Sequence, residues 1–266
     1  MAELSLRQQV LYSLCEMCTL IVLWRPGHAW PLMIGGNRDE MRNRPWTPPG
    51  RHWKDRPEVV AGLDRLGGGS WLGINDSGVT AVVMNREGTL GPERGKRSRG
   101  ELILEALDHS EAREATQALC DLDPGAYRAF NLFVGDPVSA YWLRNRGAGE
   151  SVELFEMPPG LHMLTARELD DSEVARIRIY LPRFRDAGTP EPEQGAWHTW
   201  QSLLASQLYP KDDGPHAAMN VSPTEAFGTV CSHLVAIPRH PGFEKKPVFL
   251  FANGPPDNNP FVSVAL

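Results

Sequence analysis

The chain has 266 residues, of which 41% are hydrophobic, and its 33 acidic and 27 basic residues give a net charge of −6. This composition is typical of a soluble globular protein with a substantial core. It argues against nucleic acid as a partner, because nonspecific binding to a phosphate backbone needs clustered positive charge. The longest apolar run, Thr19–Trp24, is far shorter than the roughly 20 residues that cross a bilayer, so we expect no integral membrane protein.

The N-terminal residues do not have the features of an export signal. Residues 1–16 lack a basic start, a long apolar stretch and a small-residue cleavage site. The cysteines are Cys15, Cys18, Cys120 and Cys231. Few cysteines in a chain of this length are typical of a reducing compartment, so we expect a cytoplasmic protein. We also expect residues 1–17 to form a leader or upstream extension and residues 18–266 to form one domain.

The first elements are predicted to be strands. A turn at Pro26-Gly27 separates the apolar segments Cys18–Trp24 and Pro31–Gly35, which predicts a β-hairpin that ends in the polar run Asn37–Glu40. The Pro-, Trp- and Arg-rich stretch 42–57 predicts an ordered loop. A second strand pair is then expected, formed by Gly67–Asn75 and Val79–Met84 around the turn Asn75–Gly78.

Helices and further strands are predicted in the rest of the chain. The apolar spacing within Ser98–Leu122 predicts two helices. Two more helical regions are expected at 171–185, where Pro182 should break the helix, and at Ala196–Leu208. Strands are expected at Asn131–Gly135, Ala140–Leu143, Val152–Phe155, Gly228–Ile237, Val248–Phe251 and Phe261–Val264. This order, with hairpins instead of regular βαβ units, predicts antiparallel sheets with helices packed outside them.

Cys18 is the first candidate for chemistry. If translation starts at Met17, removal of that methionine leaves Cys18 with a free α-amine whose pKa is about 7.7–8.0, close to that of a thiol. Such an amine can accept the thiol proton and activate the nucleophile. Two alternatives remain: Cys15 and Cys18 form a C-x-x-C redox or zinc pair, or Cys18 is a small buried residue at a strand start. No second pair completes a metal site.

The polar run after the second strand is expected to lie close to Cys18. Arg38 beside Asp39 and Glu40 lowers carboxylate pKa values and can orient a polar substrate group, although a surface ion-pair cluster is the alternative. Asn85, at the end of a predicted strand, can donate to an oxyanion or serve as a turn residue. Trp46, Trp53 and Trp71 are expected to fill the core or to line an apolar pocket.

Several motifs occur in an order that resembles a known family. They are Met17-Cys18-Thr19, Gly36–Glu40, Gly69–Asn75, Ser98–Leu102, Phe130–Asp136, Gly160–His162 and Phe227–Thr229. Together they resemble the NRDE family, also called the transport and Golgi organisation protein 2 family. That family looks like a branch of the N-terminal nucleophile hydrolases, which implies an α+β fold: a four-layer αββα sandwich of two antiparallel sheets.

The resemblance also implies residue roles. More distantly, the motifs are similar to the choloylglycine hydrolase and penicillin V acylase pattern, in which Cys18 would be the nucleophile, Asp39 would orient its amine and Asn85 would help form the oxyanion hole. The residues predicted to contact substrate are Asn37, Arg38, Glu40, Trp71 and Asn75. No metal site is predicted.

Three positions depart from these patterns. Gly36 stands where the acylases have arginine, Ala166 replaces the asparagine of Leu-Ser-Asn, and Val230 replaces the arginine of Gly-Thr-Arg. Alanine donates no side-chain hydrogen bond, and the loss of one oxyanion donor costs about 10²–10³-fold in rate.

Two functional hypotheses follow. The first is a hydrolase that cleaves a small amide, at a C–N bond other than a peptide bond, or a small ester, without a cofactor. The second comes from the family, whose members are implicated in haem trafficking and in lipid or acyl-coenzyme A handling. It is a non-catalytic protein whose cleft binds an amphipathic ligand, with haem as a ligand that Cys18 or a nearby histidine contacts.

Overall fold

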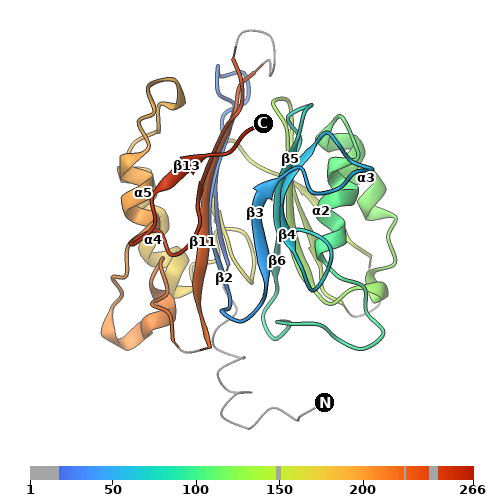
Figure 1. Ribbon diagram of the computed structural model, residues 1–266. Coiled ribbons are helices and arrows are strands. Elements are labelled where there is room, and N and C mark those ends of the chain that lie inside the picture. Colours follow the sequence, from blue (N-terminus) through green and yellow to red (C-terminus); the bar gives the residue numbers. More distant parts are fainter. Residues whose placement is uncertain (1–17, 148–150, 225, 240–244) are drawn as a thin grey trace.

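The computed structural model describes residues 18–147, 151–224, 226–239 and 245–266. Two antiparallel sheets lie face to face, and helices cover the outer face of each sheet (Figure 1). The strand and helix order therefore builds the four-layer αββα arrangement that the sequence predicts. Among the described helices, none is long and apolar enough to cross a membrane.

The first sheet holds the segment that begins at Cys18. Its spatial order is β10-β1-β2-β11-β12-β13. The strands are β1 (Thr19–Trp24), β2 (Leu32–Met41), β10 (Gly160–Leu164), β11 (Phe227–Ile237), β12 (Val248–Ala252) and β13 (Phe261–Ser263). Its outer face is covered by α4 (Ala175–Asp186) and α5 (His198–Leu204).

The second sheet has seven strands in sequence order, from β3 to β9. The strands are β3 (Trp46–Gly50), β4 (Val59–Asp64), β5 (Leu72–Asn75), β6 (Thr80–Asn85), β7 (Phe130–Gly135), β8 (Ala140–Asn145) and β9 (Glu153–Glu156). Its outer face is covered by α2 (Gly100–Leu107) and α3 (Ala112–Cys120). Short 3₁₀ turns are η1 (Pro124–Ala126), η2 (Pro192–Gln194), η3 (Lys211–Asp213) and η4 (Pro215–Ala217).

Side-chain alternation along the first sheet decides which residues face the space between the sheets. On β1, Leu20 and Val22 belong to the core between the sheets, whereas Ile21 and Leu23 pack with α4 and α5. Both faces are buried, which explains the continuous apolar run. The same alternation on β2 sends Arg38 and Glu40 toward the second sheet and Asn37 and Asp39 toward the helices.

Most predicted elements are present, and the differences have physical causes. The stretch predicted as a loop contains β3, which pairs with the unpredicted strand β4 at the sheet edge, where prolines are tolerated. The sequence also does not predict β10, which pairs with β1 and is an edge strand of the first sheet. Pro182 lies inside α4 and does not break it, because buried neighbours such as Tyr180 and Phe184 hold the helix to the core. α5 is shorter than predicted and ends at Leu204.

Candidate active site

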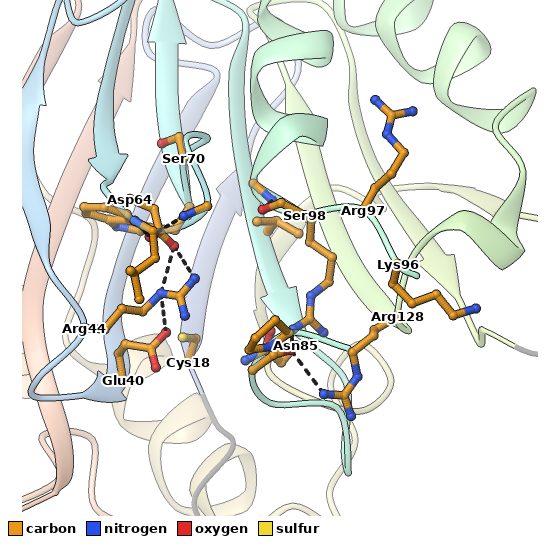
Figure 2. A pocket seen from close by; sticks show the side chains of 18 of the residues that line it. Cys18, Glu40, Arg44, Asp64, Ser70, Asn85, Lys96, Arg97, Ser98 and Arg128 are labelled. Carbon is orange, nitrogen blue, oxygen red and sulfur yellow. Dashed lines mark hydrogen bonds and ion pairs between the residues drawn. The ribbon is translucent and has the colours of Figure 1, made fainter. Parts of the chain in front are cut away.

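A cavity of about 520 Å³ opens beside Cys18. Cys18, Glu40, Arg44 and Asp64 lie on one side, and Asn85, Lys96, Ser98 and Arg128 lie across from them (Figure 2); Arg38 also lines the cavity. Arg38 and Glu40 come from β2 of the first sheet, whereas Asp64 and Asn85 come from β4 and β6 of the second, so both sheets contribute residues to the cavity. This size suits a small-molecule ligand.

The Cys18 thiol is half-buried and lies immediately before β1. It donates a hydrogen bond to the main-chain oxygen of Asp39, with an Sγ–O distance of 3.5 Å. Burial raises the pKa of the Cys18 thiol to about 12, and the negative charge of Asp39 adds to the increase. The thiol is therefore protonated at neutral pH and needs a base at close range to become a nucleophile.

The Asp39 carboxylate lies on the helix side of β2, behind Cys18. It accepts one hydrogen bond from Arg176 Nη1 of α4 at 2.8 Å and another from the Thr229 hydroxyl of β11 at 2.6 Å. Burial raises the pKa of Asp39, and the Arg176 charge and these hydrogen bonds oppose that increase. Three elements, β2, α4 and β11, thus meet at one buried carboxylate.

The sequence analysis did not single out Arg176. The residue is 137 positions from Asp39, and both side chains are 1% exposed. Arg176 also donates to the Thr19 hydroxyl at 2.7 Å and to the main-chain oxygen of His216 at 2.9 Å. No local pattern marks it, because arginine in a helix is normally exposed. Thr229 had a signal, since it lies in the Phe227–Thr229 motif.

The charged residues beside Cys18 form a compact cluster. The Arg38 guanidinium carbon lies 4.1 Å from the Trp71 ring centroid, and Arg38 Nη2 is 3.5 Å from Glu40. Arg44 pairs with Asp64 at 2.6 Å and approaches Glu40 at 3.7 Å. Two buried donors in this cluster, Arg38 Nη1 and Trp71 Nε1, have no hydrogen-bond partner. Both residues line the cavity, so a bound ligand is the natural source of acceptors.

The structure brings most of the predicted site residues together. Cys18, Arg38, Glu40, Trp71 and Asn85 line the cavity, with Asn85 on the wall opposite Cys18 (Figure 2). The Asp39 carboxylate lies on the other face of β2, on the helix side, and does not line the cavity.

Two predicted substrate contacts lie elsewhere. The Asn37 amide donates to the main-chain oxygens of Leu204 and Met219, because alternation on β2 turns it toward the helices. The Asn75 amide donates to the main-chain oxygens of Leu107 and His109, at the end of α2. The expectation that these two residues contact substrate is corrected accordingly: their amides are occupied in joining strands to helical segments.

The positions that depart from the acylase pattern also have defined places. Ala166 is buried and borders a different groove, lined by Arg86 and Glu168. Val230 lies at a bulge of β11, between Thr229 and Cys231, where the register with β2 shifts. Neither residue provides a polar side chain to the cavity.

Histidines do not contribute to the described part of the cavity, where Cys18 is the sole sulfur-bearing residue. His162 pairs with Asp170 at 2.6 Å, away from the cavity. His233 is buried with both ring nitrogens unpartnered. Within the ranges that the structure describes, no group of three or more His, Cys, Asp or Glu residues could hold a metal ion. Cys15 and His240 lie outside the described residues.

The tryptophans divide between the predicted roles. Trp71 lines the cavity, and Trp46 packs edge-on against it with ring centroids 5.6 Å apart. Trp53 packs against the second core and its Nε1 donates to the main-chain oxygen of Gly68.

A family model described as "Transport and Golgi organisation 2" matches residues 17–243, which is most of the chain. The chain belongs to this family. The bovine (Bos taurus) Transport and Golgi organization protein 2 homolog is 31% identical over 160 residues, which cover 54% of this chain and 56% of that protein. The human (Homo sapiens) homolog is 28% identical over 159 residues, with the same coverage. The matched segment thus spans about half the length of these curated relatives.

Solved structures place this family member in the N-terminal nucleophile hydrolase fold. A Caenorhabditis elegans N-acylethanolamine-hydrolyzing acid amidase ortholog superposes with a TM-score of 0.57 at 13% identity, covering 86% of this chain and 98% of that one. A variant of conjugated bile acid hydrolase from Clostridium perfringens gives 0.54 at 11% identity, covering 94% and 97%. At such identities the likeness shows the fold alone, and it confirms the predicted fold class.

Proposed function

We propose that this protein is a cysteine N-terminal nucleophile hydrolase that cleaves a small amide or ester by acyl transfer. The observation that carries the proposal is the position of Cys18. Its thiol borders a cavity of about 520 Å³ and contacts Asp39, whose carboxylate is fixed by Arg176 and Thr229. A nucleophile therefore lies at a ligand-sized opening, and the residue whose carboxylate would orient it lies directly behind.

The proposed reaction uses the α-amine that Cys18 has when it is the first residue. The amine takes the thiol proton, and the thiolate attacks the substrate carbonyl carbon to form a C–S bond. The tetrahedral intermediate collapses, the C–N or C–O bond breaks, and the leaving group takes the proton back. Water then attacks the thioester, with the amine again as base, and releases the acid. The raised pKa of the Cys18 thiol makes this base essential near neutral pH.

The developing oxyanion needs donors, and Ala166 provides none. We assign this role to the Asn85 amide and to the unpartnered donors Arg38 Nη1 and Trp71 Nε1. Buried donors are most effective when they are already fixed before charge develops. The stacking of Arg38 on Trp71 provides that fixation.

The first experiment is intact mass and N-terminal sequencing of the protein from its native host, followed by a panel of small amides and esters. A chain that starts at Cys18 should show turnover and a covalent mass increase at Cys18. The Cys18→Ala variant should lose both, whereas the control Cys120→Ala, on α3, should retain them. Full activity of folded Cys18→Ala on any identified substrate would refute the proposal.

A second candidate, a non-catalytic binding protein, is favoured by one observation. Lys96, Arg97 and Arg128 line the cavity wall that faces Cys18, which suits the phosphates of an acyl-coenzyme A better than an apolar chain alone. Haem fits less well, since the described lining offers it no histidine. A cytoplasmic role in haem trafficking or lipid homeostasis belongs to this candidate.

Equilibrium binding separates the two candidates. An acyl-coenzyme A that binds without being cleaved, in a chain that retains residues before Cys18, would favour the carrier. A haem titration with an absorbance shift that Cys18→Ala abolishes would favour haem. If the protein neither binds an acyl-coenzyme A nor shows a spectral change with haem, the hydrolase is the remaining proposal.

A further inference from the structure

Arg176 of α4 joins the two strands that carry the Cys18 centre. Its Nη1 donates to the Thr19 hydroxyl of β1 and to the Asp39 carboxylate of β2, at 2.7 and 2.8 Å. Thr19 directly follows Cys18, and Asp39 contacts the Cys18 thiol through its main-chain oxygen. One guanidinium thus fixes the residue after the nucleophile and the carboxylate behind it.

We propose that Arg176 is a positioning residue for Cys18: it aligns Asp39 behind the thiol and favours the ionised form of its carboxyl group. This inference rests on the proposed function of Cys18. Arg176 also bears on a departure noted in the sequence, since it brings a guanidinium to Asp39, which also accepts from Thr229, although position 230 is valine. The positive charge therefore comes from a helix of the outer layer.

A structural role alone explains this arrangement poorly. Replacing a buried ion pair with apolar residues of similar volume is often neutral or stabilising. The packing of α4 against the first sheet therefore does not require the Arg176–Asp39 ion pair. α4 already anchors itself through Ile177, Tyr180 and Phe184. Arg176 instead directs its hydrogen bonds to the segments around Cys18, with a further one to the main chain at His216.

The charges around Asp39 determine what the loss of Arg176 does. Besides Arg176, His216 from η4 acts on Asp39, while Cys18 is influenced by Asp39, Glu40 and Arg38. Without Arg176, a carboxylate that is 1% exposed loses its cation and should take up a proton. A neutral Asp39 no longer opposes thiolate formation, so the Cys18 thiol should titrate at lower pH.

The pH profile of Cys18 alkylation by iodoacetamide tests this without any substrate. Peptide mass spectrometry separates Cys18 from the other cysteines. Arg176→Gln and Asp39→Asn should both shift the profile to lower pH by about one unit, which is read below the midpoint as an alkylation rate about tenfold higher at the same pH. The double variant should move it no further. The control is Arg178→Gln on the same helix, because Arg178 is half exposed and pairs with Asp213.

The outcomes are decisive. An unchanged profile in folded Arg176→Gln, or a shift to higher pH, would overturn the proposal. If Arg176→Gln does not fold, Arg176→Lys decides, because lysine keeps the charge but not the forked geometry. That variant should show a smaller shift in the same direction, and a profile identical to wild type would overturn the proposal.

Turnover adds an independent readout. Arg176 does not line the described cavity, so Arg176→Gln should lower kcat by about 10²-fold, the cost of a misplaced reacting group, and leave KM unchanged. If Cys18→Ala remains active while the alkylation profile still shifts, the proposed function fails, and only the electrostatic coupling of Arg176 to the Cys18 thiol stands.

Discussion

Arg38 lies over the Trp71 ring, with the guanidinium carbon 4.1 Å from the ring centroid, and this contact joins the two sheets at the cavity wall. Arg38 belongs to β2 of the first sheet, and Trp71 precedes β5 of the second. Trp46 supports the ring edge-on. The shape of the cavity next to Cys18 therefore depends on the position of one indole ring.

Gly62 sets that position. A Cβ at Gly62 would lie 2.3 Å from Cη2 of Trp71, so Gly62→Ala must displace the ring. We expect a loss of about 1–3 kcal/mol in the free energy of unfolding, which is typical of overpacking, and weaker ligand binding because Arg38 loses its support. Urea unfolding followed by tryptophan fluorescence measures the first effect. Gly50→Ala is the control, since its Cβ would approach only His52, at 3.4 Å. Equal stability of the two variants would contradict this account.

His233 should make the protein less stable in mild acid. Burial lowers the pKa of His233 to about 3, whereas an unfolded histidine titrates near 6.5. Below pH 6.5 the unfolded state therefore binds more protons than the folded state, and stability falls as pH falls toward 3. Between pH 7 and pH 5 this amounts to about 2 kcal/mol, at about 1.4 kcal/mol per unit.

Urea unfolding at pH 7 and pH 5 checks the effect of His233. The His233→Leu variant should lose less stability than wild type between the two pH values, while the control His52→Gln, at a partly exposed position, should lose as much as wild type. If His233→Leu retains the full pH dependence, other groups cause it.

How far the sequence predicts this molecule can be judged from particular residues. Alternating or continuous apolar segments predict β1, β2 and β11, because a strand that is buried on one or both faces needs apolar residues at regular positions. The family motifs indicated the two-sheet fold and brought Cys18, Arg38, Glu40, Trp71 and Asn85 to one cavity. Asn37 was misplaced because motif spacing says nothing about which face of β2 a residue occupies.

Long-range partners were the other gap. Arg176 meets Asp39 only because α4 packs across the first sheet, and no local pattern encodes that meeting. The sequence does not predict β3 because the strand contains prolines, which an edge strand tolerates. Geometry that depends on packing between layers is thus the part that the sequence alone did not reveal.

Asn131 should be needed for stability. It is fully buried, and its amide donates to the main-chain oxygens of Thr165 and Arg167, while its oxygen accepts from Arg86. Asn131→Ala removes these hydrogen bonds from a buried site, at an expected cost of about 2–4 kcal/mol in the free energy of unfolding. Chemical denaturation measures it, with Asn258→Ala at an exposed position as the control. A loss below about 1 kcal/mol would mean that water replaces the amide.

Lys96 should strengthen the binding of ligands that carry phosphate. Its ammonium group lines the cavity and donates to the main-chain oxygen of Gly125 at 2.5 Å, a neutral partner that does not cancel the charge. Under the second candidate function, Lys96→Gln should raise the Kd for an acyl-coenzyme A by about fivefold, which corresponds to about 1 kcal/mol at a partly exposed site. The difference should shrink as salt screens the interaction. Calorimetry at low and high ionic strength measures both effects, with Lys54→Gln, exposed and outside the cavity, as the control. Equal affinities of the two variants would show that the phosphates bind elsewhere, because a charge on the cavity wall must be felt by an anion held inside it.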